Sequence, residues 1–160
     1  MTATNPPVRS VFDCNVLLQA MANPNGPAGA CIAEVKAGRI QLFVSLAILS
    51  ELTEVAARPV LVRKLALSAA RTLAFVDDLT AIAVFADPVS SVFLHPRDPK
   101  DNMYVDLAIA IGAQVITSRD RHLLALRDPA DPIGIDFMSR FASIEVFTPI
   151  QLLQRVRAGA

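Results

Sequence analysis

The feature that most constrains the fold is the alternation of short apolar runs with longer segments of helical character. Five runs predict strands, at residues 8–12, 40–44, 82–85, 114–117 and 143–147. Helical segments are predicted at residues 16–22, 28–37, 46–57, 60–67, 69–81, 99–111, 121–126 and 149–156. Parallel strands need crossover connections, which are usually helices. We therefore expect an α/β fold of three layers, α/β/α, with a mostly parallel central sheet covered on both faces.

Length and composition fit one domain. The chain has 160 residues, which favours a single domain over residues 1–160 with a core at about 8–155. Hydrophobic residues make up 53% of it, so disorder over the whole chain is excluded. Residues 128–134 are expected to form a loop, because Pro129 and Pro132 interrupt them.

Charge, cysteines and hydropathy indicate the cellular setting. Fifteen basic and fifteen acidic residues give a formal net charge of zero, which argues against a broad basic shell but not against a local one. Two cysteines, Cys14 and Cys31, make neither a disulfide framework nor a four-ligand zinc site. The first ten residues lack the apolar stretch of a signal peptide. The longest uncharged run, residues 14–33, contains two prolines and three asparagines, which argue against a membrane span. We expect a cytoplasmic protein with no membrane partner.

Acidic residues follow the ends of predicted strands. There are 11 Asp and only 4 Glu, a bias that indicates caps, turns or metal ligands. Asp13 ends the first strand, Asp120 follows the fourth, and Asp98 and Asp101 open the helix between them. Glu51 lies almost two turns into the helix after the second strand. Because the carboxyl ends of parallel strands share one sheet edge, these side chains are expected to converge there.

Carboxylates that converge repel one another and need compensation. Hard divalent cations provide it through oxygen ligands, so Mg²⁺ or Mn²⁺ is the expected ion, which suits phosphodiester hydrolysis. Each acid also has a structural explanation. Asp98 and Asp120 are suitable helix caps, and Glu51 with Glu54 forms a typical solvated helix face. Asp13 is hardest to explain this way, because a charge after an apolar strand needs a partner.

Four short motifs together resemble a known family. They read VFDCNVLL at residues 11–18, VSLAILSEL at 44–52, RDPKDN at 97–102 followed by DLA at 106–108, and VITSRD at 115–120. In this order, over about residues 8–155, they resemble the PIN-domain ribonucleases that are toxin components of bacterial toxin–antitoxin systems. The last motif is one residue longer than the commoner Thr-Arg-Asp, so the choice between Thr117 and Ser118 stays open.

The resemblance implies a site, an activity and partners. Asp13, Glu51, Asp101 and Asp120 would form the catalytic acidic cluster, with Glu54 as an alternative to Glu51. Asp13, Asp101 and Asp120 would be the metal ligands, with Asp98 as an additional or substitute ligand. Asn15 and either Thr117 or Ser118 would orient the cluster by hydrogen bonds. The implied activity is Mg²⁺- or Mn²⁺-dependent endoribonucleolytic hydrolysis of RNA with one or two ions, giving 5′-phosphate products. A homodimer and an antitoxin protein are the implied partners.

Other polar residues near the motifs receive weaker assignments. Four cations could hold substrate phosphates or could simply balance neighbouring acids: Arg97, Lys100, Arg119 and Arg121. Asp106 follows Asp101 by five residues, about 140° around a helix, so it is expected to face away from the site. His95 and His122 are given no role, because single histidines are more often surface residues than catalysts.

Two other functions are compatible with acids at the strand ends. A catalytically weak PIN-like protein that acts through RNA or protein partners is the alternative, and the complete acidic set argues against it. A receiver-like phospho-acceptor domain would need paired acids after the first strand and a late lysine. No lysine follows Lys100, which argues against that class.

Overall fold

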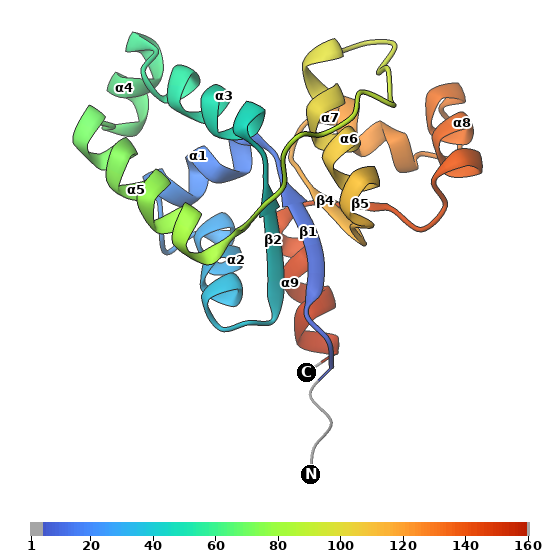
Figure 1. Ribbon diagram of the computed structural model, residues 1–160, viewed down its shortest axis with the longest axis horizontal. Coiled ribbons are helices and arrows are strands. Elements are labelled where there is room, and N and C mark those ends of the chain that lie inside the picture. Colours follow the sequence, from blue (N-terminus) through green and yellow to red (C-terminus); the bar gives the residue numbers. More distant parts are fainter. Residues whose placement is uncertain (1–4, 160) are drawn as a thin grey trace.

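The computed structural model, which describes residues 5–159, contains a five-stranded sheet whose strands are all parallel (Figure 1). The strand order is β3-β2-β1-β4-β5. The strands are β1 (Val8–Phe12), β2 (Ile40–Val44), β3 (Val84–Phe85), β4 (Val115–Thr117) and β5 (Glu145–Phe147). The predicted parallel sheet is confirmed. Strand β4 and the last three residues of β1 are buried, as expected of parallel strands that are covered on both faces.

Nine α-helices within residues 5–159 cover this sheet in a three-layer α/β/α arrangement. They are α1 (Cys14–Ala22), α2 (Pro27–Lys36), α3 (Leu46–Ala56), α4 (Pro59–Leu65), α5 (Ala69–Ile82), α6 (Asn102–Ile111), α7 (Arg121–Leu124), α8 (Pro132–Arg140) and α9 (Pro149–Ala158). Helix α6 packs on β1, β2 and β4 at the front of Figure 1, whereas α9 lies behind β1 and contacts α2, β4 and β5. No helix in this described part of the chain has the length and apolar character needed to cross a membrane.

One predicted loop is wrong. Residues 128–134 were expected to lack structure, but α8 begins at Pro132. Asp131 is its N-cap and accepts a hydrogen bond from the Ile133 amide (2.9 Å), and proline is well suited to the first helical position. Phe137 anchors the helix, because it is completely buried and packs against Phe93 with ring centroids 5.6 Å apart.

A second set of differences concerns element ends. Helix α5 continues to Ile82, which had been assigned to the third strand, and β3 keeps only two residues. Residues Pro99–Asp101 form a 3₁₀ turn, η1, before α6, and Ala125–Arg127 form another, η2, after α7. These are shifts of one to three residues at element termini, where hydrogen bonding changes gradually.

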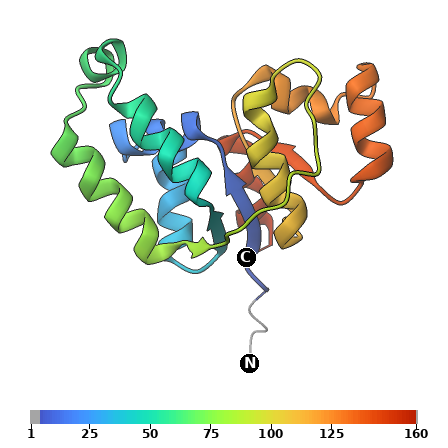
Figure 2. The same ribbon diagram turned by 45° about the horizontal axis from the view of Figure 1, so that its top comes forward.

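The segment between β3 and η1 crosses the front of the sheet beside α6 (Figure 2). Asp106 on α6 holds it, because its Oδ1 atom accepts hydrogen bonds from the amides of Val92 (2.9 Å) and Phe93 (2.7 Å). Asp106 therefore fixes the position of this segment. This agrees with the prediction from helical spacing that its side chain faces away from the site. The segment delivers Asp98 to the carboxyl edge of the sheet.

Candidate metal and nuclease site

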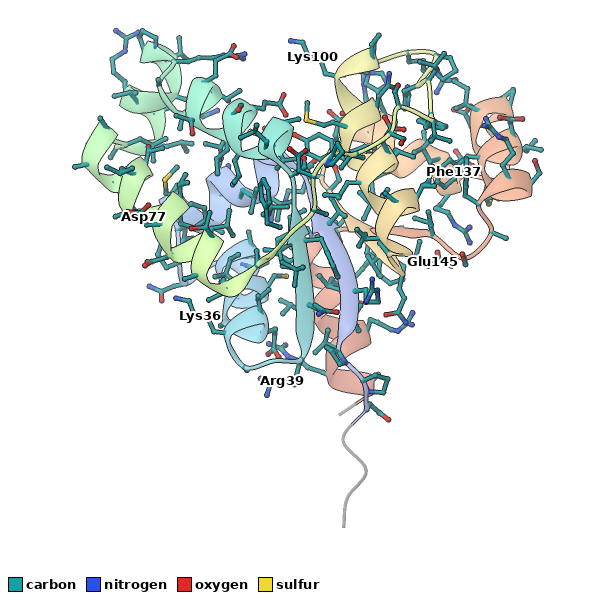
Figure 3. The ribbon with its side chains drawn as sticks, viewed as in Figure 1. Lys36, Arg39, Asp77, Lys100, Phe137 and Glu145 are labelled. Atoms are coloured by element: carbon teal, nitrogen blue, oxygen red, sulfur yellow. The ribbon has the colours of Figure 1, made fainter. Side chains whose placement is uncertain are left out.

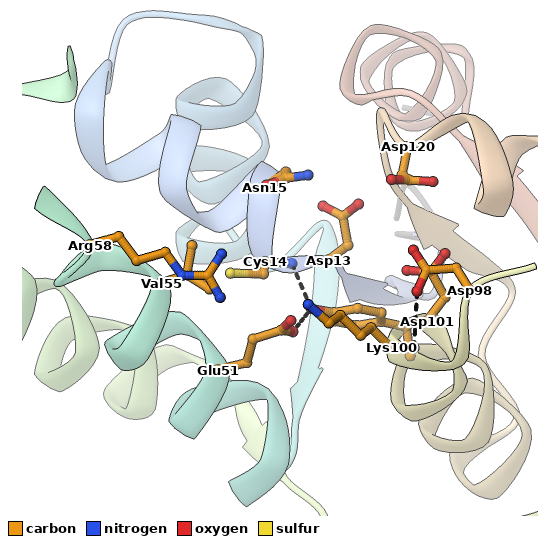
Figure 4. A pocket seen from close by; sticks show the side chains of 11 residues that line it. Asp13, Cys14, Asn15, Glu51, Val55, Arg58, Asp98, Lys100, Asp101 and Asp120 are labelled. Carbon is orange, nitrogen blue, oxygen red and sulfur yellow. Dashed lines mark hydrogen bonds between the residues drawn. The ribbon is translucent and has the colours of Figure 1, made fainter. Parts of the chain in front are cut away.

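A polar pocket lies at the carboxyl edge of the sheet, beyond the ends of β1, β2 and β4 (Figure 4). Figure 3 shows one of its lining residues, Lys100, at this end of the molecule. Its walls come from the start of α1, from α3 and the turn after it, from η1 and α6, and from the turn before α7. The lining residues are Asp13, Cys14, Asn15, Glu51, Val55, Arg58, Asp98, Lys100, Asp101, Tyr104 and Asp120. The structure thus brings together all five acids predicted for the site.

Asp13 is buried at the centre of the pocket and is the N-cap of α1. Its Oδ1 atom accepts a hydrogen bond from the Val16 amide (2.8 Å), and its Oδ2 atom accepts one from the Ser118 hydroxyl. Burial raises the pKa of the Asp13 carboxyl from 3.8 to about 6, and nearby Asp120 and Glu51 add to the rise. The two hydrogen bonds oppose it by stabilising the charged form.

Asp98, Asp101 and Asp120 form a tight group on the opposite side. Each offers one carboxylate oxygen, and the three oxygens lie within 4.8 Å of one another. Asp98 caps η1 through the Lys100 amide (3.1 Å), and Asp120 caps α7 through the His122 amide (2.7 Å). In Figure 4 the side chains of Asp98 and Asp101 lie next to each other, and Asp120 points toward them from the turn before α7.

Asp101 carries the least compensated charge of this group. Its Oδ2 atom is buried and has no hydrogen-bond partner. Burial raises the pKa of the Asp101 carboxyl to about 7, and the negative charges of Asp120, Asp98, Asp13 and Glu51 contribute further. An unpartnered buried carboxylate oxygen beside two others is unfavourable unless a proton or a cation joins them.

The donor set fits a hard divalent cation. It consists of carboxylate oxygens, which Mg²⁺ and Mn²⁺ prefer. Cys14 also lines the pocket, but burial raises the pKa of its thiol to about 12, so it offers no thiolate at neutral pH. Asp98, Asp101 and Asp120 would hold the ion, with Asp13 facing them.

Thr117 and Ser118 differ in their contacts. Ser118 donates its hydroxyl to Asp13 and accepts the Asp120 amide (2.8 Å), so it connects two of the acids. Thr117 instead shares a 3.1 Å hydrogen bond with Ser10 inside the sheet. Asn15 lines the pocket with an exposed side chain.

Glu51 lines the wall formed by α3, whereas its alternative Glu54 does not line the pocket. Glu51 accepts a hydrogen bond from the Tyr104 hydroxyl, and the same hydroxyl accepts the Cys14 amide (3.1 Å). The hydroxyl oxygen of Tyr104 therefore links α6 both to α3 and to the start of α1. Glu54 is exposed and lies 3.6 Å from Arg58.

Among the four cations proposed for phosphate binding, only Lys100 lines the pocket. Arg97 makes a two-pronged ion pair with Asp131 at 2.6 and 3.0 Å, which balances an acid outside the pocket. Arg119 and Arg121 are exposed nearby. Arg58, which the sequence did not single out, is the second cation in the lining, on the wall opposite Lys100 (Figure 4).

Sequence reasoning also missed Tyr104 and His95. Tyr104 follows Asp101 by three residues, a helical spacing that could have identified it. Arg58 follows Glu51 by seven, about two turns. His95 was expected to resemble a surface histidine, but it is only 4% exposed. Its contact with His122, 27 residues away, depends on packing, so a local pattern could not have revealed it.

Comparison with known proteins agrees with the motifs. A family model described as PIN domain matches residues 9–122, a segment that contains all five pocket acids. The chain belongs to the PIN domain family. Membership implies a nuclease-type function with an RNA substrate. This PIN domain is also similar to the uncharacterized protein MJ1680 of Methanocaldococcus jannaschii, with 31% identity over 121 residues that cover 76% of each protein.

The raised pKa of Asp13 predicts a pH-dependent difference in stability. The unfolded chain loses this proton near pH 4 and the folded chain near pH 6, so the free energy of unfolding decreases as pH rises between these values. Asp13→Asn removes the effect. In EDTA, we expect the variant to gain up to about 3 kcal/mol on the wild type between pH 4 and pH 7. Urea denaturation measures it, with exposed Asp77→Asn as control. A gain that is constant with pH would contradict the assignment.

The Tyr104–Glu51 hydrogen bond predicts energetic coupling. Tyr104→Phe and Glu51→Gln should destabilise the fold non-additively, with a coupling of at least about 1 kcal/mol in a double-mutant cycle. Glu54→Gln provides the matched control, because Glu54 lies one turn further along α3 outside the pocket. Its cycle with Tyr104→Phe is expected to be additive. Equal coupling in both cycles would show that Tyr104 does not act through Glu51.

Proposed function

We propose that the chain is a Mg²⁺- or Mn²⁺-dependent endoribonuclease. The observation that carries this proposal is the buried, unpartnered Oδ2 atom of Asp101 among four further carboxyl groups in an open pocket. Such a group destabilises the folded protein unless a cation or a proton binds to it. The carboxylate set, the pocket and the family membership all support metal-assisted phosphodiester hydrolysis.

The chain's own residues would divide the work. Asp98, Asp101 and Asp120 bind the divalent ion, which supplies charge to polarise the phosphate and to activate water. Asp13, fixed by Ser118 and Val16, would be a further ligand of the ion, as the motif resemblance implies. Glu51 orients the attacking water from the opposite wall. The water oxygen bonds to phosphorus and loses a proton, the P–O3′ bond breaks, and O3′ takes up a proton from solvent. The products carry a 5′-phosphate and a 3′-hydroxyl.

Arg58 and Lys100 would bind the phosphates on either side of the cleaved bond. They lie on opposite walls of the pocket, so a strand that crosses it passes one cation before the acids and one after them. Arg58 is 52% exposed and its nearest acid, Glu54, is 3.6 Å away, beyond hydrogen-bond distance. Its guanidinium is therefore available for a phosphate.

We further propose that the protein is the toxin of a toxin–antitoxin pair, acts as a homodimer and binds an antitoxin protein in the cytoplasm. The four-motif resemblance supports this role. Exposed apolar side chains on β3 and the segment after it, at Val84, Phe85, Val92 and Leu94, would suit a protein partner.

Cleavage of a mixed, labelled RNA pool tests the activity. We expect cutting with Mg²⁺ or Mn²⁺, none in EDTA, and a loss of about 100-fold or more in Asp13→Asn and Asp101→Asn, because even changes behind metal ligands cost 10- to 100-fold. Asp77→Asn, a matched change on the exposed face of α5, should cleave like the wild type. Undiminished cleavage by Asp13→Asn would refute the assignment. No cutting with either ion would favour the binding-protein alternative.

Arg58→Ala is expected to weaken RNA binding. The measurement uses the Asp13→Asn protein, which does not cleave the RNA. Adding Arg58→Ala to it should lower the slope of log Kd against log salt by about 0.7, the value for one phosphate contact to a single strand. In the active protein, KM should rise with kcat little changed. Arg63→Ala on α4, outside the pocket, is the control. An identical salt slope in Arg58→Ala and its parent would contradict the contact.

A further inference from the structure

His95 lies buried three residues before Asp98, with both ring nitrogens engaged. Its Nδ1 atom accepts hydrogen bonds from the backbone amides of Arg97 and Asp98, both at 3.1 Å. Its Nε2 atom lies 3.0 Å from the carbonyl oxygen of His122. The ring also packs edge-on against Phe93 and His122, with ring centroids 6.0 Å away in each case.

These partners define the tautomer. A backbone amide can only donate, so Nδ1 must be the acceptor and carries no proton. A carbonyl oxygen can only accept, so Nε2 carries the proton and donates it to His122. The neutral ring is thus fully hydrogen-bonded, and its two nitrogens contact two different parts of the chain.

These two parts of the chain carry Asp98 and Asp120, two of the three acids whose carboxylate oxygens lie close together. The Asp98 amide is held by Nδ1, while the Asp98 carboxylate caps η1. His122 accepts the hydrogen bond from Nε2–H with its carbonyl oxygen. Its backbone amide donates a hydrogen bond to the Asp120 carboxylate (2.7 Å). The ring therefore joins the turn of Asp98 directly to the turn of Asp120, across 27 residues of sequence.

We infer that His95 is a positioning residue: it sets the separation of Asp98 and Asp120 and thereby the geometry of the divalent-cation site. The inference rests on the proposed function for the identity of that site. His95 does not touch the ion or the RNA. It acts through the backbone of the two turns, and it does so without adding a positive charge that would compete with the cation.

Two substitutions separate the halves of this link. His95→Asn keeps an acceptor oxygen near the position of Nδ1 but loses the donor to His122. His95→Gln keeps an amide donor near the position of Nε2 but loses the acceptor for Arg97 and Asp98. We expect each to weaken Mn²⁺ binding about tenfold, as measured by electron paramagnetic resonance without RNA. His122→Phe retains both the backbone carbonyl and an aromatic ring, so it should bind Mn²⁺ like the wild type.

Activity provides a second readout. In both His95 variants, kcat should fall at limiting Mn²⁺ with KM for RNA unchanged, and excess Mn²⁺ should restore kcat, which would not repair a misfolded protein. Wild-type Kd for Mn²⁺ in both variants would overturn the inference while leaving the nuclease proposal intact. Mn²⁺ binding without RNA cleavage in the wild type would instead overturn the nuclease proposal alone.

The tautomer can be tested without any substitution. Long-range ¹H–¹⁵N spectra of the wild-type imidazole should show the proton of His95 on Nε2. A proton on Nδ1 would exclude both backbone contacts and overturn the inference, even if neither variant folds.

Discussion

The repulsion among five carboxyl groups at one sheet edge is the constraint on which the rest of this structure depends. The parallel topology brings them together, because all five strands end at the same edge. The same topology places the first turns of the following helices at this edge. The backbone amides of these turns have no partner within their own helix. Asp13, Asp98 and Asp120 each accept such an amide, at the first turns of α1, η1 and α7. The fold that creates the repulsion thus also supplies partial compensation.

Capping and site formation are compatible because a carboxylate has two oxygens. Asp13 uses Oδ1 for the cap and presents Oδ2 to Ser118, and Asp120 uses Oδ1 for its cap. Asp101 differs, since its side chain caps no helix and one of its oxygens has no partner. A cap that uses one oxygen leaves Asp98 and Asp120 a second one, so the two explanations that the sequence allowed for these acids, helix caps and metal ligands, do not exclude each other.

Local patterns were enough to predict most of the fold and the acids of the site. Strand and helix periodicities located β1, β2 and α6, and strand ends located Asp13 and Asp120. Helix α8 was missed because Pro132 was interpreted as an interruption, although Asp131-Pro132 repeats the cap-and-proline start seen at Asp98-Pro99. The spacing of Tyr104 from Asp101 is visible in the sequence, but its contacts with Glu51 and Cys14, 53 and 90 residues away, depend on packing. The contact of His95 with His122, 27 residues away, depends on packing as well.

The groups that orient the acids are mostly neutral, and this matters for cation binding. A serine hydroxyl holds Asp13, a tyrosine hydroxyl holds Glu51, and a neutral imidazole joins the turns of Asp98 and Asp120. Arginine would fix a carboxylate more strongly, but it would also cancel the charge that attracts the ion. Arg97, one residue before Asp98, pairs with Asp131 instead. Neutral donors thus hold the geometry while the pocket keeps its negative potential, which is the combination a divalent-cation site requires.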